Sequence, residues 1–403
     1  MKKVNKILEI IKVLNQTIGA LRFHNKSNVY LHEPDVRKED WKFVKECLSR
    51  NFVSSVGNYV NEFEDTLKKF TKAKYVIATI NGTSAIHLAL VVMGANENDE
   101  VILPSLNFVA AANAIKYCNA IPHFVEVEEE TLGIDPVKLE DYLKKIVIKK
   151  NNVSFNRYTK KRIRFMLPLH MFGHPAKILE LKKLAKNYNL KIIEDAAESL
   201  GSTYKNKHLG TFGDIGVLSF NGNKIITTGG GGALLTNSLK IAKKLKYLST
   251  TAKKPHRWKY EYSDIGYNYR MPGINASLGC AQMKRIKSYV NIKRKLFKKY
   301  KDGFKNIKDI TMFQEPKYAK SNYWLQTIIL DNKISHLKEK ILEKANNIGF
   351  SMRPIWKPLH KLDKFKLCPR MEMKTTENLE KRILNLPSSV YLLKNIKTHA
   401  KYR

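Results

Sequence analysis

Short apolar runs and stretches with helical spacing follow each other along most of the chain. The runs are partly β-branched and end in clusters of Gly, Pro, Asn or Ser, which is typical of buried strands. They lie at residues 75–79, 100–103, 122–127, 164–168, 191–193 and 215–220. Helical spacing is clearest at residues 85–93, 108–117 and 176–188. Strands that alternate with helices in this way predict an α/β fold with a mostly parallel central sheet.

The pattern changes after about residue 270. Residues 276–301 form a long helical stretch rich in Lys and Arg, followed by a strand at 327–330 and a helix at 335–347. We therefore expect three parts: an N-terminal helix and linker (1–30), a large α/β domain (31–270) and a smaller α+β domain (271–403). The first helix is amphipathic, and Glu9 and Lys12 interrupt the apolar stretch of the sequence, so it is not expected to be an export signal.

Composition narrows the class of protein. With 403 residues and 43% hydrophobic side chains, the chain can bury a large core, and no apolar run is long enough to predict a membrane span. The net charge of +37 raises the question of nucleic acid, but lysines are spread over nearly every segment, including an expected exposed excursion at 146–164. We expect no nucleic-acid or membrane partner. Four cysteines without a Cys-x-x-Cys pair favour a reducing, cytoplasmic location and no structural zinc.

Lys224 has an unusual place in the sequence. It follows the apolar strand 215–220 and the turn 221–223, and it precedes a run of four glycines at 229–232. A lysine kept partly desolvated has a lowered pKa and can form a Schiff base with an aldehyde. The alternative is an exposed turn lysine in a lysine-rich chain.

Two further strand ends carry polar groups. Residues 75–79 run into Asn81-Gly82-Thr83-Ser84 and then a helix, whose N-terminus favours a bound anion. An ordinary N-cap by Thr83 or Ser84 is the alternative. Asp195 ends another strand, and functional residues of parallel sheets gather at such ends. A lysine, a carboxylate and a hydroxyl-lined helix N-terminus are together what pyridoxal phosphate needs.

Several segments then resemble one family, the DegT/StrS-like sugar-nucleotide aminotransferases, over about residues 31–392. They are residues 81–85, 104–108, 168–170 with Gly173, 194–198, 213–214 with 219–220, Lys224 with 229–232, and 266–270. The resemblance implies the three-layer fold type I of pyridoxal-phosphate-dependent transferases. It also implies a homodimer, L-glutamate as amino donor and a nucleotide sugar as acceptor.

The resemblance assigns roles at the cofactor ring. Lys224 would form the Schiff base, Asp195 would pair with the ring nitrogen, and Phe108 would stack on the ring face. For Phe108, ordinary core packing is the alternative. Glu198 stands near the ring hydroxyl, where many relatives have Gln, so its contact and protonation are open. His170 is interpreted as a hydrogen-bonded histidine at a strand end beside the site.

The resemblance also assigns the phosphate contacts. Gly82, Thr83 and Ser84 would hold the phosphate together with Ser219. Asn268 would reach the phosphate of the partner subunit's cofactor, so the two active sites would be shared; a simple capping or turn role is the alternative.

A finer resemblance points to the branch that makes 4-amino sugars in the bacillosamine and legionaminic-acid pathways. Its segments are residues 32–34, 52–57, 220–228, 353–360 and 385–389. The expected acceptor is a UDP-2-acetamido-4-keto-2,4,6-trideoxyhexose destined for a bacterial surface glycan, with Ser55, Arg353, Trp356 and His360 as candidate substrate contacts. Some relatives have histidine in place of the lysine and are dehydratases; Lys224 favours transamination. A non-catalytic regulator that binds the cofactor is the remaining alternative.

Overall fold

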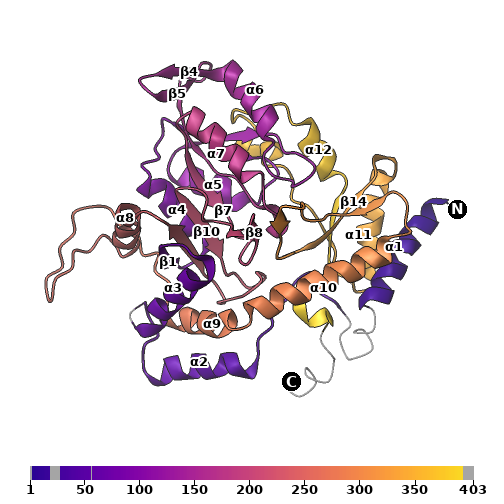
Figure 1. Ribbon diagram of the computed structural model, residues 1–403, viewed down its shortest axis with the longest axis horizontal. Coiled ribbons are helices and arrows are strands. Elements are labelled where there is room, and N and C mark those ends of the chain that lie inside the picture. Colours follow the sequence, from indigo (N-terminus) through magenta and orange to yellow (C-terminus); the bar gives the residue numbers. More distant parts are fainter. Residues whose placement is uncertain (1, 19–27, 56, 394–403) are drawn as a thin grey trace.

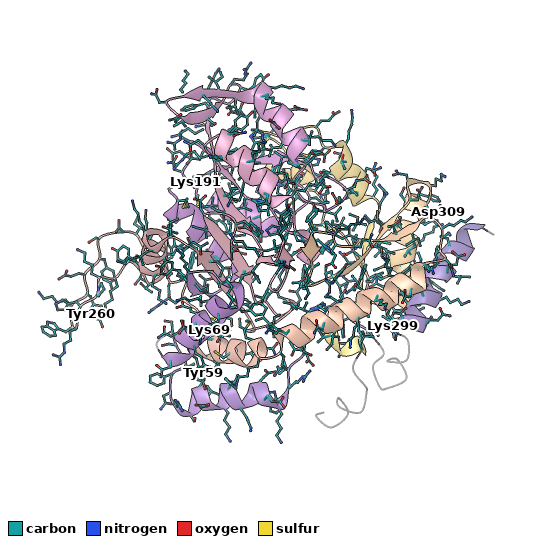
Figure 2. The ribbon with its side chains drawn as sticks, viewed as in Figure 1. Tyr59, Lys69, Lys191, Tyr260, Lys299 and Asp309 are labelled. Carbon is teal, nitrogen blue, oxygen red and sulfur yellow. The ribbon has the colours of Figure 1, made fainter. Side chains whose placement is uncertain are left out.

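The computed structural model describes residues 2–18, 28–55 and 57–393 (Figures 1 and 2). Its largest sheet is mostly parallel: the pairs from β10 to β3 run parallel, and β11 is antiparallel to both of its neighbours. In spatial order the main strands are β1 (Tyr75–Thr79), β11 (Gly232–Thr236), β10 (Ile215–Ser219), β7 (Lys191–Asp195), β6 (Arg162–Met166), β2 (Asp99–Pro104) and β3 (Ile121–Val125). The predicted α/β class and mostly parallel sheet are confirmed.

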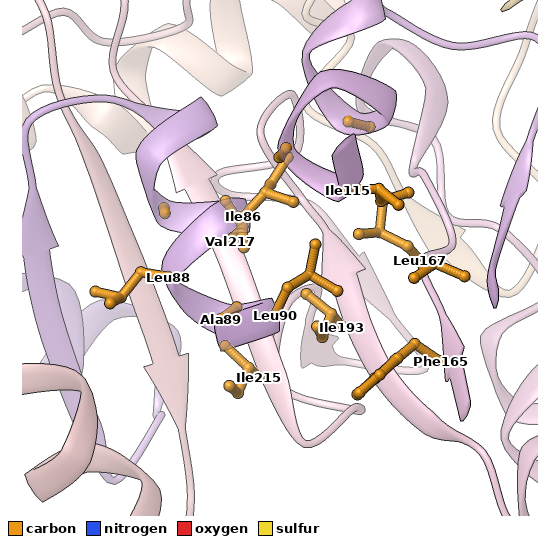
Figure 3. Close-up of a cluster of buried hydrophobic side chains, with 14 of the residues drawn as sticks. Ile86, Leu88, Ala89, Leu90, Ile115, Phe165, Leu167, Ile193, Ile215 and Val217 are labelled. Atoms are coloured by element: carbon orange, nitrogen blue, oxygen red, sulfur yellow. The ribbon is translucent and has the colours of Figure 1, made fainter. Parts of the chain in front are cut away.

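Helices cover both faces of this sheet. One face carries α4 (Gly82–Val92), α5 (Val109–Tyr117) and α8 (Leu239–Ser249). The other carries α3 (Asn58–Thr71), α6 (Pro136–Ile146), α7 (Ile178–Asn187) and α9 (Gly273–Met283). Neighbouring strand residues divide between the two cores: Ile77 packs in the cluster with α4, whereas Val76 and Ala78 pack on the opposite face. Figure 3 shows the first cluster, in which Ile86 and Leu90 meet strand residues such as Val217.

The segment expected as an exposed excursion at 146–164 is largely a hairpin on the sheet. β4 (Val147–Lys150) pairs with β5 (Val153–Asn156), and β5 pairs in turn with β6. Asn156 and Thr159 donate hydrogen bonds to the buried carboxylate of Glu100. The expected exposure is confirmed at residues 148–152 and 157–160, whereas Ser154 and Asn156 are buried because their polar groups have partners that are remote in sequence.

The C-terminal part forms a second, antiparallel sheet, ordered β12 (Ile310–Met312), β14 (Gln326–Leu330), β16 (Ile383–Leu386) and β15 (Arg353–Pro354). Around it lie α1 (Lys2–Ile18), α10 (Ile286–Phe304), α11 (Lys338–Asn347) and α12 (Lys374–Glu380). A small sheet joins β13 (Ala319–Lys320) to β8 (Thr203–Tyr204) and β9 (Lys207–His208). It ties the C-terminal part to the loop that follows β7.

Two helices show how the parts meet. The amphipathic first helix is confirmed: Ile10 and Leu14 of α1 are buried in the cluster that contains Tyr300 of α10. The long helical stretch expected at 276–301 consists of two helices, α9 and α10, which are separated by Lys284 and Arg285. There the Arg285 guanidinium pairs with the buried carboxylate of Asp40 in α2 (Lys38–Ser49). α9 lies beyond the expected domain boundary at residue 270, but it packs on α2 and α3, which precede that boundary. The boundary therefore stays a prediction. Within the described part of the chain, no helix has the length and apolar character needed to cross a bilayer.

Candidate active site

The carboxyl ends of three strands lie beside each other at one edge of the large sheet. Thr79 at the end of β1 and Ser219 at the end of β10 both pair with Gly232 of β11. Asp195 at the end of β7 pairs with Val217 of β10. Pairing therefore brings Asp195, Ser219 and the start of α4 to the same edge.

The N-terminus of α4 is built as a potential anion site. Its N-cap is Asn81, whose side-chain oxygen accepts the amide of Ser84 at 2.7 Å, so neither Thr83 nor Ser84 is the cap. The amides of Gly82 and Thr83 have no acceptor within the helix. A Cβ on Gly82 would lie 3.1 Å from Cβ and 3.2 Å from Oγ of Ser219, so the hydroxyl of Ser219 adjoins these amides. Two free amides, a hydroxyl and the helix dipole suit a phosphate.

Lys224 is largely buried at this edge. Its Nζ lies 3.6 Å from Oε1 of Glu198, and 14% of its side chain is exposed. Burial lowers the pKa of Lys224, and the nearby carboxylates of Glu198 and Asp195 only partly offset this effect. Lys224 is therefore not an exposed turn lysine, and burial shifts the pKa of its amine in the direction that favours Schiff-base formation.

Trp324 covers the amine, and the sequence did not single it out. Its ring centroid lies 3.8 Å from Nζ of Lys224, and its indole N–H donates to the backbone carbonyl of Asn223 at 2.7 Å. The ammonium of Lys293, which is completely buried, donates to the carbonyl of Trp324 at 2.9 Å. Trp324 precedes β14 in the C-terminal part, and no local pattern there indicates contact with residues 223–224. A tryptophan outside any periodic apolar face is the one signal that could have drawn attention to it.

Two buried carboxylates face Lys224. Burial raises the pKa of Asp195, whose Oδ1 accepts the amide of Ala197 at 3.1 Å. Burial also raises the pKa of Glu198, to about 7, against the opposing effect of Lys224. Oε2 of Glu198 accepts the amide of Phe172 at 2.7 Å, which holds Phe172 at a positive φ of 54°. The raised pKa of Glu198 thus lies near neutral pH, and its carboxyl group lies 3.6 Å from the amine of Lys224.

His170 and Glu194 form a hydrogen-bonded pair beside the end of β7. The ring Nε2 of His170 lies 3.1 Å from Glu194, and its Nδ1 accepts the amide of Ala176. Glu194 also accepts the amides of Gly210 and Gly213. The interpretation of His170 as a hydrogen-bonded strand-end histidine is confirmed.

An aromatic cluster continues the site away from the lysine. Phe108 is 52% exposed, which excludes ordinary core packing for its ring. Its ring centroid lies 5.8 Å from that of Trp356, and Trp356 lies 5.5 Å from Phe172. Because the amide of Phe172 binds Glu198, this chain of rings joins Phe108 and Trp356 to the carboxylate beside Lys224.

The remaining candidate contacts are placed elsewhere or have partners of their own. Both ring nitrogens of His360 are engaged, by Ser105 and Glu377. The guanidinium of Arg353 donates to Asn346, Ser55 lies in the loop between α2 and α3, and Asn268 is exposed. None of the described contacts joins these four side chains to Lys224, so their roles stay predictions.

These groups fit pyridoxal phosphate. A desolvated amine can hold the aldehyde, a buried carboxylate can pair with a protonated ring nitrogen, and the α4 terminus can take the phosphate. The fold and this donor set define a pyridoxal-phosphate-dependent enzyme of the aminotransferase class.

Comparison with known proteins specifies the family. The sequence model of the DegT/DnrJ/EryC1/StrS aminotransferase family matches residues 34–397, and the chain belongs to this family. It is 36% identical to the putative pyridoxal phosphate-dependent aminotransferase EpsN of Bacillus subtilis, over 82% of each chain. It is 34% identical to GDP-perosamine synthase of Escherichia coli O157:H7, over 89% of this chain and 92% of the relative.

A solved structure agrees in fold. Helicobacter pylori PseC, an aminotransferase involved in the biosynthesis of pseudoaminic acid, superposes with a TM-score of 0.81 at 25% identity, covering 92% of this chain and 96% of that one. The protein is therefore a pyridoxal-phosphate-dependent sugar aminotransferase.

The raised pKa of Glu198 predicts a pH-dependent cost of folding. The native state holds the Glu198 proton up to about pH 7, whereas an ordinary glutamate loses it near 4.5, so the wild type should lose stability across that window. Glu198→Gln keeps the shape and the acceptor for Phe172. In cofactor-free protein it should be more stable than the wild type by about 2–4 kcal/mol above pH 7 and equal to it below about pH 4.5. Denaturant unfolding from pH 4 to 8 measures this difference, and parallel curves for the two proteins contradict it.

Proposed function

We propose that the enzyme transfers the amino group of L-glutamate to a nucleotide-linked 4-keto-6-deoxy sugar. The proposed acceptor is a UDP-2-acetamido-4-keto-2,4,6-trideoxyhexose, and the product serves the synthesis of a bacterial surface glycan. The observation that carries the chemistry is the buried amine of Lys224 between Trp324, Glu198 and Asp195. The choice of sugar rests on the resemblance of residues 32–34, 52–57, 220–228, 353–360 and 385–389 to the 4-amino-sugar branch.

The residues divide the work by their charge and position. Bound pyridoxal phosphate supplies an electron-withdrawing ring that stabilises negative charge on the substrate carbon. Because burial lowers the pKa of Lys224, its Nζ can take a proton from the amino-bearing carbon of glutamate and return one to the acceptor. Asp195 would pair with the ring nitrogen and keep it protonated, and the α4 terminus with Ser219 would hold the phosphate. Trp324 and Glu198 hold Nζ in place between these steps.

A dehydratase and a non-catalytic regulator are weaker alternatives. The dehydratase relatives have histidine where this chain has Lys224, and a buried, desolvated amine beside two carboxylates is a costly arrangement for a protein that only binds its cofactor.

The shape of the chain supports a homodimer with shared sites. The segment between α8 and α9 projects from the body, with Tyr260 far out along it (Figure 2). Its side chains Trp258, Tyr260 and Ile265 are 69%, 75% and 86% exposed. Large apolar side chains on a projecting segment are suited to contact with a second copy. Asn268 stands at the base of this segment, where its backbone bridges to Thr250 and its side chain is exposed.

A panel of keto-sugar nucleotides tests the substrate. With L-glutamate as donor, the UDP-linked 2-acetamido sugar should be aminated at carbon 4, as identified by NMR of the product. Lys224→Ala should reduce turnover by about 10³-fold or more, because the residue both holds the cofactor and moves the proton. The matched control is Lys191→Ala, a lysine with 53% of its side chain exposed at the opposite end of β7. It should retain wild-type turnover.

A GDP-linked 4-keto-6-deoxyhexose is the second candidate acceptor, favoured by the 34% identity to GDP-perosamine synthase. Turnover of this compound alone would overturn the choice of nucleotide but leave the reaction class intact. Absence of amino transfer to every keto sugar would overturn the proposed function itself.

Subunit mixing tests the shared site. If Asn268 serves the partner's pocket, a dimer of one Lys224→Ala and one Asn268→Ala subunit has one pocket with both changes and one with neither. After exchange of equal amounts, activity should rise to about a quarter of the wild-type value, because half of the dimers are mixed and each has one intact pocket. The test requires that Asn268→Ala alone is clearly impaired. Activity equal to the average of the two parents would show that Asn268 acts in its own subunit.

A further inference from the structure

His32 is a buried histidine beside the active lysine, and nothing above assigns it a role. Both of its ring nitrogens are buried. The backbone of Asn223 is the hydrogen-bonding group beside the ring, and its geometry is too poor for a full hydrogen bond. Its backbone is held on both sides: Leu31 accepts the amide of Ser388 at 2.6 Å, and the amide of Glu33 donates to Ser389 at 2.8 Å. The backbone that carries the ring is therefore held on both sides, and at least one ring nitrogen has no partner among the described residues.

The surroundings of the ring place it at Lys224. It faces the backbone carbonyl of Asn223, which already accepts the indole N–H of Trp324. Burial lowers the pKa of His32, and the positive charges of Lys293 and Lys224 lower it further. At neutral pH the ring is therefore uncharged, with one nitrogen that donates and one that accepts.

A second buried histidine, His174, offers a comparison outside the active site. Both ring nitrogens of His174 lack a hydrogen-bond partner among the described residues, and burial lowers its pKa to about 3. Its ring packs against Phe313 and Tyr323, with centroids at 4.4 and 4.9 Å. Unlike His32, it has no described interaction with Lys224. Both rings are buried, and His32 differs in that it adjoins Lys224 and the backbone of Asn223.

We propose that His32 is a substrate-binding residue that hydrogen-bonds an uncharged oxygen of the acceptor sugar, a hydroxyl or the keto oxygen. Leaving a polar ring unpaired destabilises the protein, and such a cost is common where a group is kept for a ligand. A neutral imidazole can donate a hydrogen bond to a sugar oxygen or accept one from a sugar hydroxyl. The carboxylates of glutamate are bound more strongly by a positively charged side chain. The assignment rests on the proposed function, because it presumes a sugar acceptor.

The test separates stability from the two half reactions. Stopped-flow absorbance of the holoenzyme follows the reaction with glutamate and, separately, the return reaction with the keto sugar. His32→Leu should raise the midpoint of thermal unfolding by about one to a few degrees, because it removes an unpaired buried group. The glutamate half reaction should be unchanged, and the sugar half reaction should fall by about 5- to 100-fold in kcat/KM. His32→Gln, which can still donate and accept, should recover part of that loss.

His174→Leu is the matched control. It should raise the unfolding midpoint in the same direction and leave both half reactions at wild-type rates. Loss of stability in His32→Leu with an equal fall in both half reactions would show a structural role and overturn the proposal. A selective fall in the glutamate half reaction would overturn the assignment to the sugar. Failure of the proposed function is distinguishable, because the wild-type enzyme would then show no sugar half reaction at all.

Discussion

Desolvation of one amine is the constraint on which the rest of this site depends. Lys224 lies among Trp324, Glu198 and Asp195, and burial lowers its pKa more than the two carboxylates raise it. The same burial raises the pKa of both carboxylates. Burial therefore shifts the pKa of the amine and of the carboxylates toward each other, the kind of perturbation that is common where side chains transfer protons.

The fold maintains this condition by joining remote segments. The large sheet supplies the strand ends that carry Asp195 and Ser219, while Trp324 comes from the turn before β14 in the C-terminal part. That turn is anchored by the buried Lys293 of α10 and by Asn322, which donates to the carbonyl of Glu198. The same contacts between the two parts therefore hold both Trp324, which covers the amine of Lys224, and Glu198, which lies beside it.

The sequence predicted those features whose signal is local. Lys224, Asp195 and the start of α4 each follow a recognisable strand, and parallel strands bring their ends to one edge. β11 was missed because it begins within the glycine run, so the short apolar segment that follows was not separated from the preceding turn. Trp324 and His32 could not be placed, since their contacts with residues 223–224 depend on the packing of distant segments. For the same reason the sequence could not show that both nitrogens of His360 are occupied by Ser105 and Glu377.

The most direct test asks which lysine of this lysine-rich chain holds the cofactor. Borohydride reduces the carbon–nitrogen double bond between pyridoxal phosphate and its lysine, and peptide mass spectrometry then locates the modified residue. We predict that the label will be on Lys224. Lys293 is the sharpest competitor, because it is completely buried and its pKa is also lowered by burial. A label on Lys293, or on any lysine other than Lys224, would contradict the account.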